Sequence, residues 1–232
     1  MRQKNNLLKL VKFDNYINSA YKKRILIGID EVGRGALAGP VIACAFFWKV
    51  DLEKTPKSDY KKLYKLNDSK QLNSKDRNEP CKQLKKYGNF SLGYASVQEI
   101  EKLNVLNATF LAMKRAYEKL ISLLEETSTF APYILIDGNK FNPYINCPQL
   151  PIVGGDAKSS VIAGASIIAK VYRDELMAKI SKSKKYKCFG WNKNVGYGTA
   201  FHRNAIKENG LTPLHRKLFV RKVEAWLPRP HL

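Results

Sequence analysis

The 232-residue chain has few acidic residues for its size. Asp and Glu number 20 against 41 Lys and Arg, which gives a formal net charge of +21. This balance excludes an acidic disordered chain and favours a polyanionic partner. The hydrophobic content of 44% and the charged content of 26% are ordinary for a globular protein. A chain of this length forms one large domain, or one domain with an appendage.

Cysteine, histidine and long apolar runs are also scarce. The four cysteines, at positions 44, 81, 147 and 188, form no C-x-x-C pair, which excludes a zinc ribbon and the common dithiol redox motif. The three histidines, His202, His215 and His231, have no metal-ligand spacing, and we assign them no catalytic role. No apolar run reaches about 18 residues, and the basic N-terminus has no apolar signal core. We therefore expect a soluble, reduced protein of the cytoplasm, with no membrane attachment.

Short apolar runs alternate with amphipathic stretches along the chain. Runs at 25–29, 41–48, 90–97, 132–136 and 149–153 have the length and residue types of buried strands. Stretches from Ser74, over 103–124 and over 159–172 predict helices. This alternation indicates an α/β fold with a mixed sheet. We expect a basic arm over 1–24 (a short helix or a loosely held segment), a sheet domain over 25–175, and a basic helical lobe with its tail over 176–232.

Three of the apolar runs end at acidic residues. Asp30 and Glu31 close the first run, Asp137 closes another, and Asp156 follows the last one. In open α/β sheets, ligands gather at the carboxyl ends of the strands, and converging carboxylates repel one another unless a cation lies among them. One isolated acid is usually a solvated loop residue, but three such endings in an acid-poor chain favour a site for two Mg²⁺ or Mn²⁺ ions. Asp30 and Glu31 face opposite sides of a regular strand, so we expect the strand to end at them.

The glycine turn after the first run fits a dinucleotide-binding fingerprint, with Gly33, Gly35, Ala38 and, further on, Asp51. Its context argues against that interpretation. Pro40 would break the required helix, a strand follows instead, and the adjacent acids would repel a pyrophosphate. A nicotinamide-dependent enzyme is therefore the least favoured function. The turn is better explained as a close approach of backbone to a ligand, with Arg34 as a phosphate contact.

Several motifs together resemble the bacterial ribonuclease HII family, the type-2 ribonucleases H. They lie at 29–35 (IDEVGRG), 66–70 (LNDSK), 104–109 (NVLNAT), 135–138 (LIDG), 155–156 (GD), 165–174 (ASIIAKVYRD) and 196–202 (GYGTAFH). The resemblance covers about residues 25 to 220 in the family's order. The chain departs from the family at Gly154, where a lysine is usual, and at Ala163-Gly164, where Ser-Ala is frequent.

The resemblance implies a ribonuclease H-like fold, with a five-stranded mixed sheet flanked by helices and a C-terminal helical lobe. It implies an endoribonuclease that cleaves the RNA strand of RNA–DNA hybrids and nicks at single ribonucleotides embedded in duplex DNA. The products would carry 5′-phosphate and 3′-hydroxyl ends. Two Mn²⁺ or Mg²⁺ ions are the implied cofactors, the nucleic acids are the implied partners, and we expect a monomer.

The resemblance also implies a role for individual residues. The catalytic and metal-binding residues would be Asp30, Glu31, Asp137 and Asp156. The substrate-binding residues would be Gly33, Arg34, Gly35, Lys70, Ser166, Lys170 and Tyr197. The turn would read the 2′-hydroxyl that distinguishes RNA from DNA, and Tyr197 would lie against the junction nucleotide, although it could equally be an ordinary turn tyrosine. Lys170 could instead be a surface cation, and we expect Asp174 to pair with Arg173 or Lys170.

Two other functions remain open on the sequence alone. A nucleic-acid-binding protein without catalysis would use the same basic zones, of which 176–222 has twelve Lys and Arg and one acid. Such a protein would have no need of acids at three strand ends. A Holliday-junction resolvase or an exonuclease of the same fold would also use two metals. Cutting at a ribonucleotide, rather than at a DNA branch or end, separates these enzymes.

Overall fold

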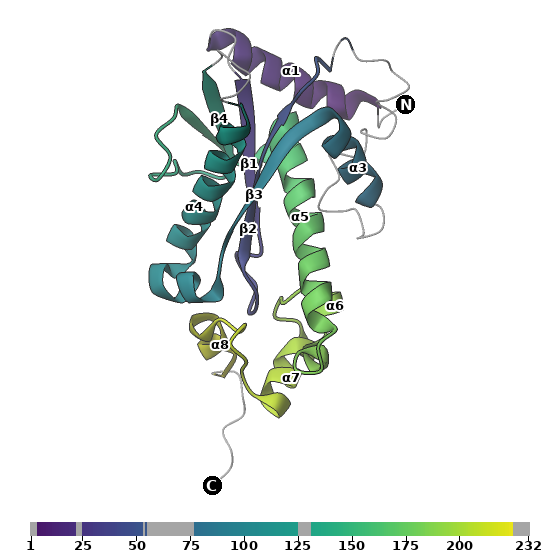
Figure 1. Ribbon diagram of the computed structural model, residues 1–232, viewed down its shortest axis with the longest axis vertical. Coiled ribbons are helices and arrows are strands. Elements are labelled where there is room, and N and C mark those ends of the chain that lie inside the picture. The colour runs from purple at the N-terminus through teal and green to yellow at the C-terminus, as the bar shows by residue number, and fades with distance from the viewer. Residues whose placement is uncertain (1–3, 22–24, 53, 55–76, 125–130, 225–232) are drawn as a thin grey trace.

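The computed structural model describes residues 4–21, 25–52, 54, 77–124 and 131–224 (Figure 1). Its five-stranded sheet consists of β1 (Ile25–Val32), β2 (Val41–Trp48), β3 (Gly88–Ala95), β4 (Pro132–Asp137) and β5 (Gln149–Ile152). The strand order is β3-β2-β1-β4-β5. β2 runs antiparallel to both β1 and β3, whereas β4 runs parallel to β1 and β5. The expected five-stranded mixed sheet is therefore confirmed.

Helices cover both faces of this sheet. One face carries α5 (Ser160–Ser181), with α1 (Lys4–Ala20) and α3 (Asn78–Tyr87) beside it. The other carries α4 (Val97–Leu124), so that α4 and α5 lie on either side of the sheet in Figure 1. Two apolar clusters, one per face, fill these layers. The central strands are buried on both faces, which explains why they are continuous apolar runs rather than alternating ones.

The N-terminal segment forms the helix α1 and packs on the core. The side chains of Leu7, Leu10 and Val11 on this helix are buried. Asp14 Oδ2 accepts hydrogen bonds from the Ser160 backbone N (2.8 Å) and Oγ (2.5 Å). Because these groups begin α5, the Asp14 carboxylate satisfies backbone N–H groups that a helix start leaves unpaired. Of the two possibilities for this segment, the helix is the one observed.

Several element boundaries differ from those expected. β1 does not end at Asp30 but continues to Val32, and α5 continues past Tyr172 to Ser181. α4 begins at Val97 and is divided at Asn104, whose φ of 66° lies in the left-handed region. Asn104 Oδ1 accepts hydrogen bonds from the backbone N–H groups of residues 106 and 107, so it caps the second half of α4. The expected start at Ser74 and the 66–70 motif with Lys70 lie outside the described residues.

The C-terminal part forms a helical lobe at one end of the sheet (Figure 1). It contains η3 (Lys187–Phe189), α6 (Trp191–Asn194), α7 (Ala200–Asn209) and α8 (Lys217–Glu224). Phe189 and Trp191 are buried together with Leu37 and Met177 in a separate apolar cluster. α5 runs unbroken across residues 175 and 176, so the domain boundary expected there remains a prediction. Among the described helices, none is long and apolar enough to cross a membrane.

Candidate active site

A pocket of about 350 Å³ opens at the ends of β1 and β4. Three acidic side chains line it, Asp30, Glu31 and Asp137. The remaining lining residues are Val32, Gly33, Arg34, Gly35, Arg77, Ser166, Lys170 and Tyr197. The structure therefore brings together nine of the eleven residues singled out in the sequence. Asp156 does not line this pocket, and Lys70 lies outside the described residues.

Asp30 and Glu31 are neighbours on β1 that share the pocket although the strand does not end at them. β1 pairs with β2 up to Val32–Ile42, but its pairing with β4 stops at Ile29–Ile136. One edge of β1 is therefore open beyond Ile29. This open edge allows side chains from both faces of the strand to reach one pocket. The expectation that the strand ends at Asp30 is wrong. The end of the pairing with β4 is by itself sufficient to let both side chains reach the pocket.

On β1, Asp30 is buried and Glu31 is partly buried, and both lie close to other negative charges. Burial, followed by the charges of Glu31 and Asp137, raises the pKa of Asp30 well above its usual value. The Glu31 backbone N–H (2.7 Å to Oδ1) and the Ser166 side chain donate to Asp30 and oppose that rise. Burial and the charge of Asp137 also raise the pKa of Glu31, against the attraction of Arg34. Asp30, Glu31 and Asp137 can all be ionised together only when a cation lies close to them.

Asp137 and Asp156 are connected through the backbone between them. Asp137 ends β4, and its Oδ1 accepts a hydrogen bond of 2.7 Å from the Gly155 N–H. A side chain at Gly155 would collide with Ile162, since its Cβ would lie 2.5 Å from Ile162 Cδ1. Asp156 follows in the short 3-10 helix η2 (Gly155–Ala157) and is buried. Gly154 has a φ of 65°, a conformation in which the family's usual lysine would be strained.

The donor set fits a hard divalent cation. Within the described ranges, no three His, Cys, Asp or Glu side chains are grouped closely enough to hold a metal ion by themselves. Mg²⁺ rarely requires such a cage, because it is usually held by one or two carboxylates, with water and substrate phosphate as the other ligands. Asp30, Glu31 and Asp137 around one pocket meet that requirement.

Cations lie on the α5 side of the pocket. Lys170 Nζ lies 2.9 Å from Asp174 Oδ1, and Arg77 Nη2 lies 3.1 Å from Asp174 Oδ2. Lys170 Nζ is also 5.7 Å from the centroid of the Tyr197 ring. The expectation that Asp174 pairs with Arg173 or Lys170 is therefore confirmed, and Lys170 is the partner observed. Arg77 was not expected, because nothing in the polar stretch from 49 to 87 distinguishes it from its many basic neighbours.

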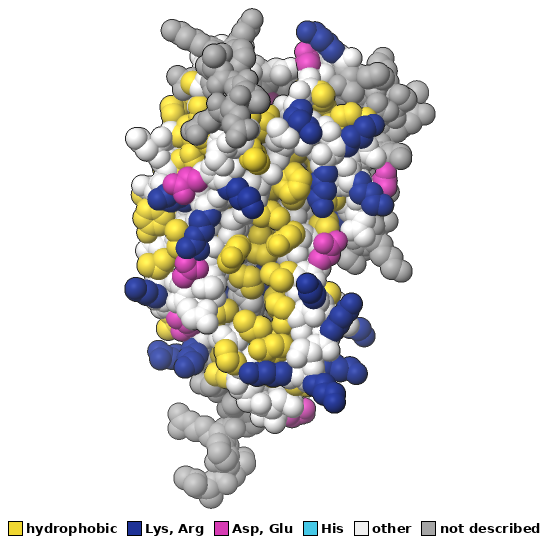
Figure 2. Space-filling view, viewed as in Figure 1, with side chains coloured by type: hydrophobic (Ala, Val, Ile, Leu, Met, Phe, Trp, Pro, Cys, Tyr) yellow, Lys and Arg dark blue, Asp and Glu magenta, His cyan; other side chains and the backbone are white. Residues whose placement is uncertain are grey.

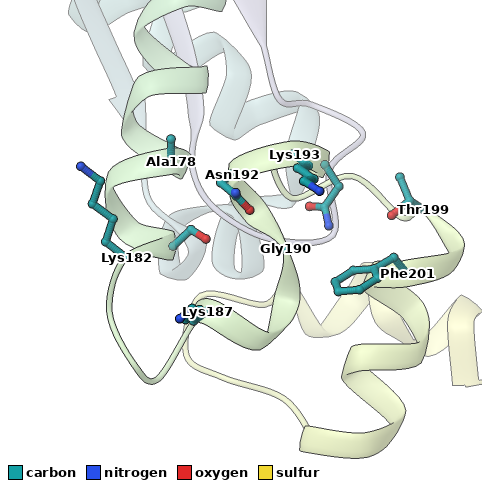
Figure 3. Close-up of a pocket in the computed structure, with 10 residues that line it drawn as sticks. Ala178, Lys182, Lys187, Gly190, Asn192, Lys193, Thr199 and Phe201 are labelled. Carbon is teal, nitrogen blue, oxygen red and sulfur yellow. The ribbon is translucent and has the colours of Figure 1, made fainter.

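A larger pocket, of about 900 Å³, lies in the C-terminal lobe (Figure 3). Lys182, Lys187 and Lys193 line it together with the aromatic ring of Phe201. None of its ten lining residues is acidic, so it offers no carboxylate ligand for a metal. Elsewhere on the surface, Figure 2 shows Lys and Arg side chains on both sides of an apolar strip. The large pocket therefore presents lysine ammonium groups and an aromatic ring, without a carboxylate.

The sheet order and the helices on both of its faces define a ribonuclease H-like fold, with three carboxylates in one pocket at the ends of β1 and β4. The family model "Ribonuclease HII" matches residues 27–222. The chain belongs to the ribonuclease HII family, the metal-dependent endoribonucleases that cleave RNA in RNA–DNA hybrids and at ribonucleotides embedded in DNA. The resemblance seen in the sequence is thereby confirmed.

Individual relatives agree with this assignment. A ribonuclease HII of Paramagnetospirillum magneticum is 44% identical over 195 residues, which is 84% of this chain and 90% of the relative. The ribonuclease HII in a PCNA complex from Archaeoglobus fulgidus has a TM-score of 0.67 at 21% identity, over 90% of this chain and 98% of that one. Bst-RNase HIII, solved in complex with Mn²⁺, has a TM-score of 0.65 at 20% identity, over 89% of this chain and 71% of that one. The two solved structures support the fold.

Proposed function

We propose that Asp30, Glu31, Asp137 and Asp156 bind two divalent ions, Mn²⁺ or Mg²⁺, for hydrolysis of a phosphodiester bond at a ribonucleotide. The observation that carries this proposal is the single pocket that collects the carboxylates of Asp30, Glu31 and Asp137 from β1 and β4. The Mn²⁺ bound by Bst-RNase HIII supports the choice of metal. Asp156 is included because its neighbour Gly155 donates to Asp137, which keeps η2 next to the pocket.

The ions would supply a nucleophile at neutral pH and neutralise charge on the leaving 3′-oxygen. The protein itself contributes orientation. The Glu31 backbone N–H and the Ser166 side chain both hydrogen-bond to Asp30 and fix its carboxylate. Arg34 lies 3.6 Å from Glu31 and is half-exposed, so its guanidinium can also contact a phosphate at the mouth of the pocket. Lys170 and Lys70 are the other proposed phosphate contacts.

Recognition of RNA must involve the 2′-hydroxyl, and the glycine turn is the part of the pocket suited to it. Gly33 and Gly35 line the pocket without a side chain between backbone and ligand. Tyr197 lies across the pocket, beside Lys170. We infer that the turn hydrogen-bonds the 2′-hydroxyl while the Tyr197 ring contacts the junction nucleotide.

Connected pockets lead from this pocket to the lobe and are the proposed route of the nucleic acid; the middle one has three Lys and Arg side chains and the acids Asp174 and Glu175. A third pocket, of about 470 Å³, shares Arg77 and Lys170 with the carboxylate pocket. At its other end it shares Asn192 and Lys193 with the large lobe pocket of Figure 3. The exposed ring of Phe201 at the end of this route can stack on a base. The continuity of the three pockets supports binding of a strand over several nucleotides.

The test is a nicking assay on duplex DNA that contains one ribonucleotide, with Mg²⁺, Mn²⁺ or a chelator. We expect one nick at the ribonucleotide, no nick with the chelator, and a loss of about a hundredfold or more in Asp137→Asn. Asn retains an oxygen for the Gly155 N–H, so the melting temperature should change little. Asp51→Asn is the control, since Asp51 pairs with Lys54 at the surface. Activity of Asp137→Asn within about tenfold of wild type, or cutting of branched DNA without ribonucleotides, would contradict the proposal.

A further inference from the structure

Two arginines outside the proposed catalytic set are completely buried. They are Arg173 on α5 and Arg216, which directly precedes α8. None of the described Asp and Glu residues forms a salt bridge with either guanidinium. Burial lowers the pKa of Arg173, and burial together with the charge of Arg173 lowers the pKa of Arg216 to about 9. A buried cation without an opposite charge is destabilising unless hydrogen bonds satisfy it, so the partners of these groups are informative.

Arg216 binds the carbonyl groups at both ends of the glycine turn. Its Nε and Nη2 donate to Gly39 O at 2.9 and 2.7 Å, and its Nη1 donates to Arg34 O at 2.9 Å. The peptide between residues 34 and 35 is planar and trans, so its N–H points opposite to its carbonyl. With the Arg34 carbonyl directed at Arg216, the Gly35 N–H is directed away from this buried side chain. Arg216 therefore sets which way the amide of a pocket-lining residue points.

Arg173 joins the same turn to the segment that carries Tyr197. Its Nη2 donates to Ala38 O at 3.1 Å, and its Nη1 donates to Val195 O at 2.7 Å. Its Cζ lies 5.5 Å from the centroid of the Tyr197 ring. A Cβ on Gly33, which has a φ of 86°, would lie only 2.1 Å from Arg173 Nε. Gly33 is thus required both for its backbone conformation and for the approach of this guanidinium.

Backbone hydrogen bonds complete the attachment of the turn to the lobe. The N–H groups of Leu37 and Ala38 both donate to Gly196 O, at 2.8 and 3.2 Å. The Arg216 N–H donates to Leu37 O at 2.8 Å. The geometry of residues 33–40 is therefore determined by residues that follow them by more than 130 positions.

We propose that Arg173 and Arg216 are positioning residues that determine selectivity for a ribonucleotide over a deoxyribonucleotide, by holding the 33–40 turn and Tyr197 in one fixed arrangement. This inference rests on the proposed function, in which that turn and Tyr197 read the sugar. Arginine suits the role because its planar fork donates to several carbonyls at once. Lysine presents a single compact ammonium and cannot reproduce that pattern.

The test measures substrate selectivity in Arg173→Lys and Arg216→Lys. KM and kcat are determined for a duplex with one ribonucleotide, and the all-DNA duplex of the same sequence serves as a competitive inhibitor with a measured Ki. We expect KM to rise about tenfold, the effect of one lost hydrogen bond, while Ki stays unchanged. Arg115→Lys is the matched control, because Arg115 also forms a fork, with Glu99, but on the α4 side of the sheet. We expect it to change neither constant.

The outcomes separate this inference from the proposed function. A fall in kcat or in melting temperature with the ratio of Ki to KM within about twofold of wild type would show a merely structural role and overturn the inference alone. If the wild-type protein had equal values of Ki for the all-DNA duplex and KM for the ribonucleotide duplex, the proposal that the turn recognises the 2′-hydroxyl would be overturned, and this inference with it. Where a lysine variant fails to fold, Arg216→Gln retains an N–H donor without the buried charge, and the same shift in the ratio is expected of it.

Discussion

Asp14 illustrates how a single buried carboxyl couples stability to pH. It lies on α1 and accepts hydrogen bonds from the start of α5. Burial raises the pKa of Asp14 to about 6 from 3.8, although the hydrogen bonds from Ser160 oppose the rise. The folded state therefore favours the protonated carboxyl. The associated stabilisation is fully present below pH 3.8 and is lost as the pH rises through 6.

We expect this carboxyl to lower the free energy of unfolding by about 2 kcal/mol between pH 4 and pH 7. Asp14→Asn should remove that part of the pH dependence, because Asn does not titrate. The measurement is urea unfolding of both proteins across this range, and the difference between them isolates Asp14 from the other acids that titrate there. Parallel pH profiles for the two proteins would show that Asp14 does not contribute.

The residue scale also shows why Asp174 pairs with Lys170 rather than with Arg173, the other expected partner. Lys170 and Asp174 are four positions apart on α5, the spacing at which helical side chains meet, and they do pair. Arg173 and Asp174 are adjacent, and adjacent helical side chains point in different directions. Arg173 therefore faces the glycine turn while Asp174 faces Arg77. The burial of Arg173 depends on a turn more than 130 residues earlier, which local sequence does not reveal.

At the scale of elements, the contact between β1 and α5 places the carboxylates next to Ser166 and Lys170. Gly28 allows this contact, since a Cβ there would lie 2.2 Å from the Val161 carbonyl carbon. We expect Gly28→Ala to lower the free energy of unfolding by about 3 kcal/mol or more, because backbone cannot move aside, and to reduce nicking. Chemical denaturation and the nicking assay measure the two effects.

Gly164→Ala is the matched control at the same layer. Its Cβ would lie 2.8 Å from the Phe46 ring, a side chain that can shift, and alanine favours the helix by up to about 1 kcal/mol. The two effects offset each other, so we expect stability close to wild type. If Gly28→Ala were as stable as Gly164→Ala, the close contact of β1 with α5 would not be a constraint on the site.

The strands were predictable because burial on both faces makes each a continuous apolar run. That Asp30 and Glu31 share one pocket was not predictable, because it depends on which strands lie beside β1. The β4 strand that leaves the edge of β1 open begins at Pro132, a hundred residues downstream. Alternation along one strand can place the two acids on opposite faces, but it cannot show that a missing neighbour lets both reach one pocket. Asp137 and Gly155 likewise meet only through the pairing of β4 with β5.

At the scale of the whole molecule, the net charge of +21 predicts substrate binding that weakens steeply with salt. We expect the double variant Lys187→Gln and Lys193→Gln to reduce the slope of log Kd against log salt by about one for each lysine that contacts a phosphate. Lys114→Gln with Lys119→Gln removes the same charge from α4, on the face of the sheet that α5 does not cover, and should leave the slope nearly unchanged. Fluorescence anisotropy between 50 and 300 mM salt, with a labelled duplex, measures both. Equal slopes in the two double variants would place the duplex elsewhere.

The attachment of the 33–40 turn to residues 173 and 216 has a consequence for synthesis on the ribosome. Chains emerge N-terminus first, so β1 and its two acids are exposed long before α5 and the lobe exist. The turn beside those acids cannot take its final shape until Arg216, more than 170 residues downstream of it, has left the exit tunnel. The order of translation therefore delays a competent nuclease until the lobe has been synthesised, and a nascent chain that lacks the lobe carries carboxylates without the geometry to use them.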